Sequence, residues 1–353
     1  MGTQETAAVL EDIDELDRGI VNALQIHPRA PWTLVGEVLG VDPVTVSRRW
    51  RRLADRGLAW VTAHSRPAEG SNVVIATVEI ETVAGASDDV ARQLAAHRAA
   101  VNVKRTAGGR DIVVTVQAAG LDELARYLAR EVSPITGVKS TRTHVATMMP
   151  VEGSRWRLRS LDAEQRRRME RAVPAPVGPM APWHEVDGRL MELLGIDGRM
   201  PLNDLAARAG TSVATVRRRL RALVGSRVVL RCDIARPLSG WPVSAIYLAS
   251  APAEHLNEVS RVLAGVPEVR SCMVAAGPHN LIIDVWLRGV TEVHALEAYL
   301  SGRLARLTIE DRAVVLATVK HMGRLLDEAG RCVGVVPMAQ WAEPGPAARG
   351  SAR

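Results

Sequence analysis

Hydrophobic residues recur along the chain with two alternating periods, one typical of helices and one typical of strands. Leu16, Ile20 and Leu24 are spaced four residues apart, which predicts an amphipathic helix. From residue 72 the period changes to two, with one apolar side formed by Val74, Ala76, Val78 and Ile80. The chain therefore begins with a helical module and continues with a module that contains strands.

The helical module is predicted to hold three short helices. Pro31 precedes the second helix, and Gly40 ends it where a left-handed residue suits a tight turn. Asp42 caps the third helix, whose apolar side is Val46, Trp50 and Leu53. Two helices joined by a short glycine turn predict a helix-turn-helix, and an apolar segment at 58–61 suits a wing or a connecting strand.

The strand module alternates strands and helices in the order βαββαβ. The strand from residue 72 is followed by a helix at 88–97, strands at 101–105 and 112–116, a helix at 121–132 and a strand at 138–146. This order is typical of a ferredoxin-like sandwich, whose sheets commonly pair with one another.

The whole unit occurs twice. Residues 16–53 align with 186–223 without a gap and share 12 of 38 positions, among them Asp17/Asp187, Arg29/Arg199, Thr45/Thr215 and Arg49/Arg219. The strand module recurs at an offset of 169, for example 107–114 against 276–283.

The fold class is therefore α+β, with two winged helix-turn-helix modules and two ferredoxin-like modules. The helix-turn-helix modules are expected at 12–64 and 183–235, and the ferredoxin-like modules at 72–150 and 242–322. Residues 151–182 are expected to form an Arg/Pro-rich linker with a helix capped by Ser160, and residues 337–353 a disordered tail.

Charge changes this picture once it is sorted by position. The net charge of +6 is spread over 353 residues, but residues 18–62 hold 7 Arg against 3 acids and residues 183–233 hold 9 against 6. The linker holds 7 Arg against 4 acids. Basic helix-turn-helix modules predict double-stranded DNA as a partner.

The outer face of each third helix carries the candidate DNA contacts. Threonine can touch a thymine methyl group or a phosphate, and arginine can reach guanine or the backbone. These candidates are Thr45, Ser47, Arg48, Arg51 and Arg52 in the first copy and Thr215, Arg217, Arg218 and Arg221 in the second. A solvated helix face is the plainer interpretation, but recurrence of the threonine and the arginines favours DNA.

Other classes of function find little in the sequence. No apolar stretch reaches the ~18–20 residues that span a bilayer, and the acidic start lacks an export signal, so we expect a cytoplasmic protein without a membrane partner. Three separated cysteines predict reduced thiols. The scattered histidines predict no metal site, and no phosphate-binding or serine-hydrolase motif occurs, so neither a cofactor nor an enzymatic activity is expected.

Five short segments of the chain carry a recognisable pattern: Leu16-Asp17, Leu39-Gly40-Val41, Thr45-Val46-Ser47-Arg48-Arg49, Gly108-Gly109-Arg110-Asp111 and Gly137-Val138. With this pattern the chain resembles the Lrp/AsnC family of transcriptional regulators. The resemblance implies a DNA-binding module and a sensor module, often called RAM, that binds amino acids or similar metabolites at subunit interfaces. By position, it implies an effector site near Gly108, Asp111 and Gly137, and near Gly277 and Asn280 in the second copy. A tight β-hairpin is the alternative explanation for these loop residues.

Single-copy members supply two DNA readers by dimerising, so the resemblance implies a dimer fused into one chain. The paired sheets further imply a homo-oligomer, a dimer of fused chains. Two alternatives stay open: an enzyme like the siroheme decarboxylases, which resemble this family and which His279-Asn280 and Trp286 faintly suggest, and a ligand-binding protein that no longer holds DNA.

Overall fold

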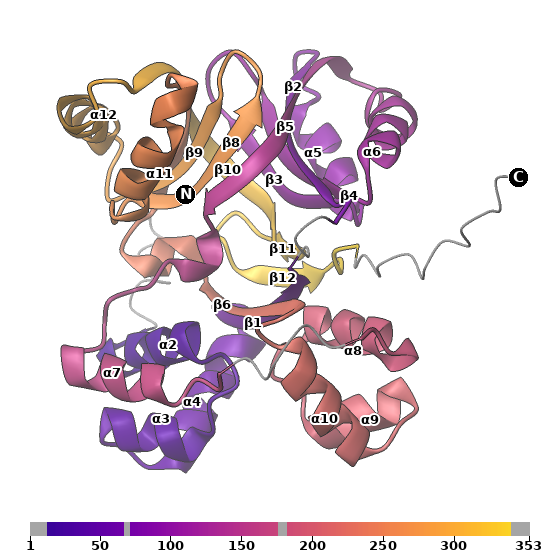
Figure 1. Ribbon diagram of the computed structural model, residues 1–353, viewed down its shortest axis with the longest axis vertical. Coiled ribbons are helices and arrows are strands. Elements are labelled where there is room, and N and C mark those ends of the chain that lie inside the picture. Colours follow the sequence, from indigo (N-terminus) through magenta and orange to yellow (C-terminus); the bar gives the residue numbers. More distant parts are fainter. Residues whose placement is uncertain (1–12, 67–70, 176–181, 340–353) are drawn as a thin grey trace, which may run out of the picture.

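The computed structural model describes residues 13–66, 71–175 and 182–339 (Figure 1). Two helical modules lie at one end of the molecule and two sheet modules at the other. Parts of three predicted segments lie outside the described residues: residue 12 of the first helix-turn-helix module, residues 176–181 of the linker and residues 340–353 of the tail.

The first helical module forms where the apolar period predicted it. Its elements are α2 (Glu15–Ile26), α3 (Trp32–Leu39), α4 (Pro43–Asp55) and β1 (Ala59–Ser65). Gly40 is left-handed with φ of 69°, and the side chain of Asp42 accepts a hydrogen bond from the Val44 amide, so both predicted turn signals are confirmed. Leu24 and Val46 are fully buried in the shared core.

The second helical module repeats this arrangement. Its elements are α8 (Glu185–Ile196), α9 (Leu202–Ala209), α10 (Val213–Leu223) and β6 (Val228–Ile234). Gly210 ends α9 with φ of 65°, and Ser212 caps α10 by accepting from the Thr215 amide.

Strands β1 and β6 pair with each other and form a two-stranded ribbon between the helical modules. The pairing is antiparallel, with Ala59 opposite Ile234 and Ser65 opposite Val228. Because the two strands occupy equivalent places in the two copies, the ribbon lies across an approximate twofold axis. The predicted wing or connecting strand is therefore a connecting strand.

Both strand modules have the predicted βαββαβ order. The first contains β2 (Val74–Thr82), α5 (Ser87–Ala96), β3 (Ala100–Thr106), β4 (Ile112–Ala118), α6 (Leu121–Tyr127) with a π-helical turn at Leu128–Val132, and β5 (Val138–Val151). The second contains β7 (Val243–Ser250), α11 (Leu256–Ala264), β8 (Val269–Ala276), β9 (Leu281–Leu287), α12 (Glu292–Arg303) and β10 (Thr308–His321).

The two four-stranded sheets join at both edges and close into a ring of eight strands. β5 of the first module pairs with β8 of the second, and β10 of the second pairs with β3 of the first. The helices cover the outer faces, where Leu94 and Leu263 are fully buried. The inner faces enclose a second, smaller core that includes Ile246 and Met273.

The segment between the copies is more ordered than a linker. It contains α7 (Ala163–Arg171), which begins at the cap Asp162 and not at the predicted Ser160, because the side chain of Asp162 accepts from Glu164 and Gln165. Met169 of α7 is fully buried in the core of the first helical module.

A C-terminal hairpin of β11 (Arg324–Leu326) and β12 (Cys332–Val335) extends the sheet beyond β10, and the sequence patterns did not predict it. Within the predicted disordered tail, Met338 is only 3% exposed, so the chain is packed at least that far.

Candidate nucleic-acid interface

The second and third helices of both modules lie at the same end of the molecule, away from the sheets (Figure 1). Thr45 and Thr215 lie in the first turn of α4 and α10, and both are partly exposed. Val44, next to Thr45, is 73% exposed.

Five of the predicted arginines are exposed and uncompensated. Within the described part of the chain, no hydrogen bond or ion pair holds the side chains of Arg48, Arg51, Arg217, Arg218 and Arg221. Ser47 is partly exposed on the same helix as Arg48. Free guanidinium groups along one helix are suited to phosphate and guanine acceptors.

Arg52 differs from the prediction because it is already engaged. It donates to Asp17 on α2, the carboxylate that also accepts from Arg49 at 3.2 Å. In the second copy, Arg219 donates to Asp187 through two bonds of 2.8 and 2.6 Å. The repeated Asp/Arg identities therefore mark a clamp between the first and third helices, and Arg52 belongs to it.

A second repeated arginine joins the two modules. Arg29 donates to the carbonyl oxygens of Gly198 and Met200 at 2.7 and 3.0 Å. Arg199 donates in return to those of Pro28 and Ala30, also at 2.7 and 3.0 Å. Arg29 and Arg199 are identities of the repeat, and this recurrence is the sequence signal for their shared role.

The loop residues predicted to bind an effector form hydrogen bonds and turns that hold the hairpins in shape. Asp111 accepts from the amide and hydroxyl of Thr82 at 2.7 and 3.1 Å, and Asn280 bonds both backbone groups of Ala251. Gly108 and Gly137 have φ of 102° and 100°, and a Cβ on Gly137 would lie 2.6 Å from Ala86.

The hairpins nevertheless bring the two copies together. A Cβ on Gly277 would lie 3.7 Å from Nδ1 of His144 in the other copy. Beside Gly108, Arg110 bridges Glu79 of its own module and Asp311 of the other. Arg110 belongs to the loop motif in the sequence, but its contact with Asp311 depends on the assembled copies and has no local sequence signal.

A buried ionic network ties the ribbon to the second sheet module. Asp233 on β6 accepts from Arg231 at 2.7 Å and from Arg270 on β8 at 2.7 Å, and His321 on β10 lies 3.5 Å away. Burial alone would raise the pKa of Asp233, but Arg231, His321 and Arg270 outweigh it and hold that pKa well below its usual value. The ring of Trp286 stacks against Arg270 at 4.4 Å.

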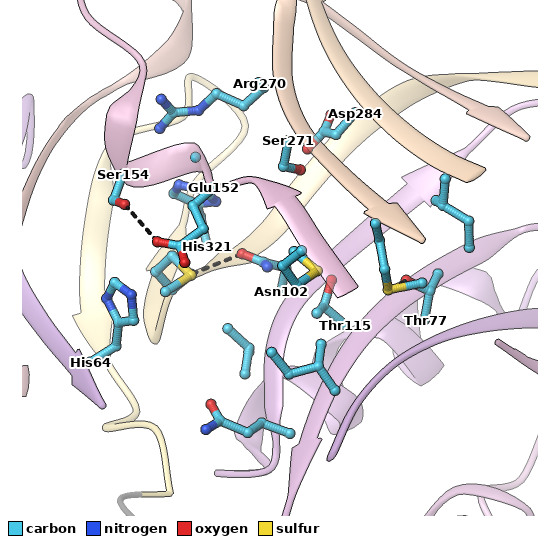
Figure 2. Close-up of a pocket in the computed structure, with 18 of the residues that line it drawn as sticks. His64, Thr77, Asn102, Thr115, Glu152, Ser154, Arg270, Ser271, Asp284 and His321 are labelled. Carbon is cyan, nitrogen blue, oxygen red and sulfur yellow. Dashed lines mark hydrogen bonds between the residues drawn. The ribbon is translucent and has the colours of Figure 1, made fainter. Parts of the chain in front are cut away.

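The ribbon also forms one wall of an internal cavity of about 200 Å³ (Figure 2). Its walls come from the inner faces of both sheets and from β1 and β6, and they include His64, Asn102, Glu152, Arg270 and Asp284. The cavity is far larger than the roughly 10–15 Å³ that one water needs.

Among the described residues, no group of three or more histidine, cysteine or acidic side chains is arranged to hold a metal ion. No helix in the described ranges is both long and apolar enough to cross a membrane.

Comparison with known families finds the two modules that the geometry suggests. The AsnC-type helix-turn-helix domain matches residues 13–54 and again 185–224. The Lrp/AsnC ligand binding domain matches residues 75–156.

Curated relatives match about one copy of the repeat. The HTH-type transcriptional regulator FL11 of Pyrococcus horikoshii is 29% identical over 134 residues, which cover 38% of this chain and 88% of FL11. The HTH-type transcriptional regulator LrpA of Mycobacterium tuberculosis is 28% identical over 40% of this chain and 93% of its own length.

A solved structure matches both copies at once. The siroheme decarboxylase NirDL covers 88% of this chain and 93% of its own, with a TM-score of 0.54 and 15% sequence identity. At that identity the likeness concerns the fold alone.

Proposed function

Because this chain belongs to the Lrp/AsnC family, we propose that it is a sequence-specific DNA-binding transcriptional regulator in which one chain supplies both DNA readers. The observation that carries the proposal is the arrangement of α4 and α10. Each presents uncompensated arginines, and both lie at one end of the molecule across the β1–β6 ribbon. Two such helices suit DNA half-sites about 10 bp apart, centre to centre.

The proposed contacts are Thr45, Ser47, Arg48 and Arg51 on α4 and Thr215, Arg217, Arg218 and Arg221 on α10. In the repeat, Ser47 corresponds to Arg217 and Arg52 corresponds to Ala222, so the two readers differ. We therefore expect an imperfectly palindromic operator.

Fluorescence anisotropy with genomic DNA fragments tests the proposal. Each phosphate contact adds roughly 0.9 to the slope of log affinity against log salt, so binding should weaken steeply with salt. Arg48→Ala and Arg218→Ala should each cost about 1–3 kcal/mol of DNA affinity. Arg92→Ala is the matched control, because Arg92 is also an exposed arginine, on α5 at the far end of the molecule. Binding that is insensitive to salt, or equal losses in all three variants, would refute the DNA-binding role.

The effector that we propose is an amino acid or a related small metabolite at the hairpins that contain Gly108, Asp111, Gly277 and Asn280, beside Gly137. The contacts between each hairpin and the opposite copy support a site there. Addition of an amino-acid pool should change the DNA affinity, and Asp111→Asn should reduce that change. We also propose that two fused chains associate, and sedimentation velocity at several concentrations measures this directly.

Enzymatic decarboxylation is the alternative that the shared fold keeps open, and we propose that the chain does not perform it. The sequence relatives given above are regulators, whereas NirDL shares the architecture at 15% identity. Incubation with siroheme, followed by absorbance and carbon dioxide release, separates the two. Turnover would overturn this part of the proposal.

A further inference from the structure

The two ends of the internal cavity are related by the repeat, yet they carry different chemistry. The strand pairings of the two modules correspond at an offset of 169 residues. By this offset, Asp233, Arg231, Arg270 and His321 at the β6 end correspond to His64, Thr62, Val101 and Glu152 at the β1 end. A twofold dimer of identical chains would have the same groups at both ends.

At the β6 end, two arginine side chains fill the space and neutralise a carboxylate. Arg231 and Arg270 both donate to Asp233, and all three residues are at most 5% exposed. At this end, guanidinium groups therefore balance a buried carboxylate, and the guanidinium group of Arg270 also stacks on the rings of Trp156 and Trp286.

At the β1 end, the arginines are replaced by the shorter Thr62 and Val101, and Val101 lines the cavity. A carboxylate is nevertheless present, because Glu152 extends into the cavity between His64 and Asn102 (Figure 2). It accepts a hydrogen bond from the Ser154 hydroxyl at 3.4 Å, and among the ion pairs of the described residues none includes Glu152.

Among the described residues, no cationic group forms an ion pair with Glu152, although three arginines also line the cavity. Arg231 and Arg270 lie 3.6 and 3.7 Å from the place of a Cβ on Gly153, but both donate to Asp233. Arg66 donates to the carbonyl oxygen of Gly225.

Burial lowers the pKa of His64 to about 3, so its ring is uncharged at neutral pH, and its buried Nδ1 has no hydrogen-bond partner among the described residues. Lys104, which also lines the cavity, is paired with Asp284 of the other copy. The lining also includes apolar side chains, among them Val113 and Met273.

We propose that this cavity is a ligand site, present once per chain, for an organic cation whose amino or guanidinium group pairs with Glu152 and whose apolar body lies against the sheets. The site is separate from the hairpins and deepens the proposed function, on which its regulatory meaning rests. Because His64 belongs to β1, a ligand here contacts the ribbon that joins the two recognition helices.

Isothermal titration of the full chain with n-butylguanidinium tests the site. We expect one binding event per chain, and binding weaker by roughly tenfold or more for n-butylurea, which has the same shape without the charge. Glu152→Gln should weaken butylguanidinium binding by a similar factor, whereas Glu254→Gln, which changes an exposed carboxylate, should leave it unchanged.

Val101→Arg is a second variant, independent of the first. It places at the β1 end the residue that the β6 end already has, so it should abolish butylguanidinium binding and raise the melting temperature of the ligand-free chain. Absence of binding at millimolar concentrations, two events per chain, tighter binding of valerate, or unchanged binding in Glu152→Gln would overturn the proposal.

The DNA assay keeps this proposal distinct from the regulatory one. If Arg48→Ala and Arg218→Ala leave DNA binding untouched while butylguanidinium binds as expected, the regulatory proposal fails and the ligand site stands. If DNA binds as expected and the cation does not, the ligand site fails alone.

Discussion

A buried ion pair fixes the angle between the first and third helices of the second helical module. Asp187 is fully buried, and Arg219 meets it with two hydrogen bonds of 2.8 and 2.6 Å. Removing one partner of such a pair leaves an uncompensated charge in the interior, which usually costs far more than a surface pair contributes.

Asp187→Ala should therefore lower the free energy of unfolding by about 3–5 kcal/mol. Urea denaturation of the full chain measures the loss. Arg92→Ala, which breaks an exposed pair with Asp89, should change stability by less than about 1 kcal/mol. Equal losses in the two variants would contradict a buried clamp.

The lowered pKa of His64 predicts that the stability of the folded chain depends on pH. Its pKa is about 3 in the folded chain, against an ordinary value of 6.5, so the unfolded chain binds the proton more readily. Well above pH 6.5 this histidine is neutral in both states and does not affect stability; as pH falls from 6.5 toward 3, protonation of the unfolded chain lowers the stability of the fold.

Between pH 6.5 and 5, this single group should remove about 1.5–2 kcal/mol of stability. His64→Asn should flatten that part of the profile in urea denaturation. His294→Asn, which changes a histidine that is 81% exposed, should leave the profile as it is. A His64→Asn profile as steep as that of the unchanged chain would refute the assignment.

At this scale, the sequence predicted the exposed arginines because an exposed position follows from helix period alone. It could not separate Arg52 from Arg48, since the carboxylate that holds Arg52 lies on another helix. The role of Arg29 was equally hidden, because its partners are backbone oxygens of the other copy and have no side-chain signature.

At the scale of elements, α7 changes the character of the segment between the copies. Asn22 and Gln25 on α2 accept from the amides of Ser160 and Leu158, which fixes the approach to α7, and Met169 then enters the core. Composition alone predicted a linker, because seven arginines and several prolines outweigh one methionine in any average over the segment.

Met169→Ala should cost about 2–5 kcal/mol of stability, as expected when a long side chain is removed from a closed core. Arg167→Ala on the same helix, which breaks only an exposed pair with Glu164, is the control. Near-identical denaturation curves for the two variants would show that α7 does not contribute to the core.

Most strands and helices were predictable, since periods of two and four and the turn residues are local signals. The β11–β12 hairpin was not. It depends on Arg324, which donates to the carbonyl oxygens of Val61 and Ile196 at 3.2 and 2.7 Å, far away in the chain. Such a contact becomes visible only when the modules are assembled.

At the scale of the whole molecule, the ring of eight strands makes each copy the edge partner of the other. Both junctions, β5 with β8 and β10 with β3, cross between copies. The backbone groups at four strand edges are thereby satisfied within one chain.

Co-expression of residues 1–175 and 182–353 as two polypeptides should therefore yield a stable one-to-one complex. The same two junctions, the ribbon and the Arg29 and Arg199 contacts remain available without the connecting peptide. Size-exclusion chromatography with mass detection reads the stoichiometry. Separate elution of the two halves would show that the peptide linkage, and not the ring, holds the copies together.

The closed ring should also prevent the sheets of this chain from pairing with those of related chains in the same cell. A regulator built from separate single-copy chains offers its unpaired sheet edges to any chain with a matching edge pattern. Here the complementary edge is always present at high effective concentration on the same polypeptide, so at the β5–β8 and β10–β3 junctions a foreign subunit has no vacant edge to occupy. Each chain should therefore keep one fixed pair of DNA readers, whichever paralogues are expressed beside it.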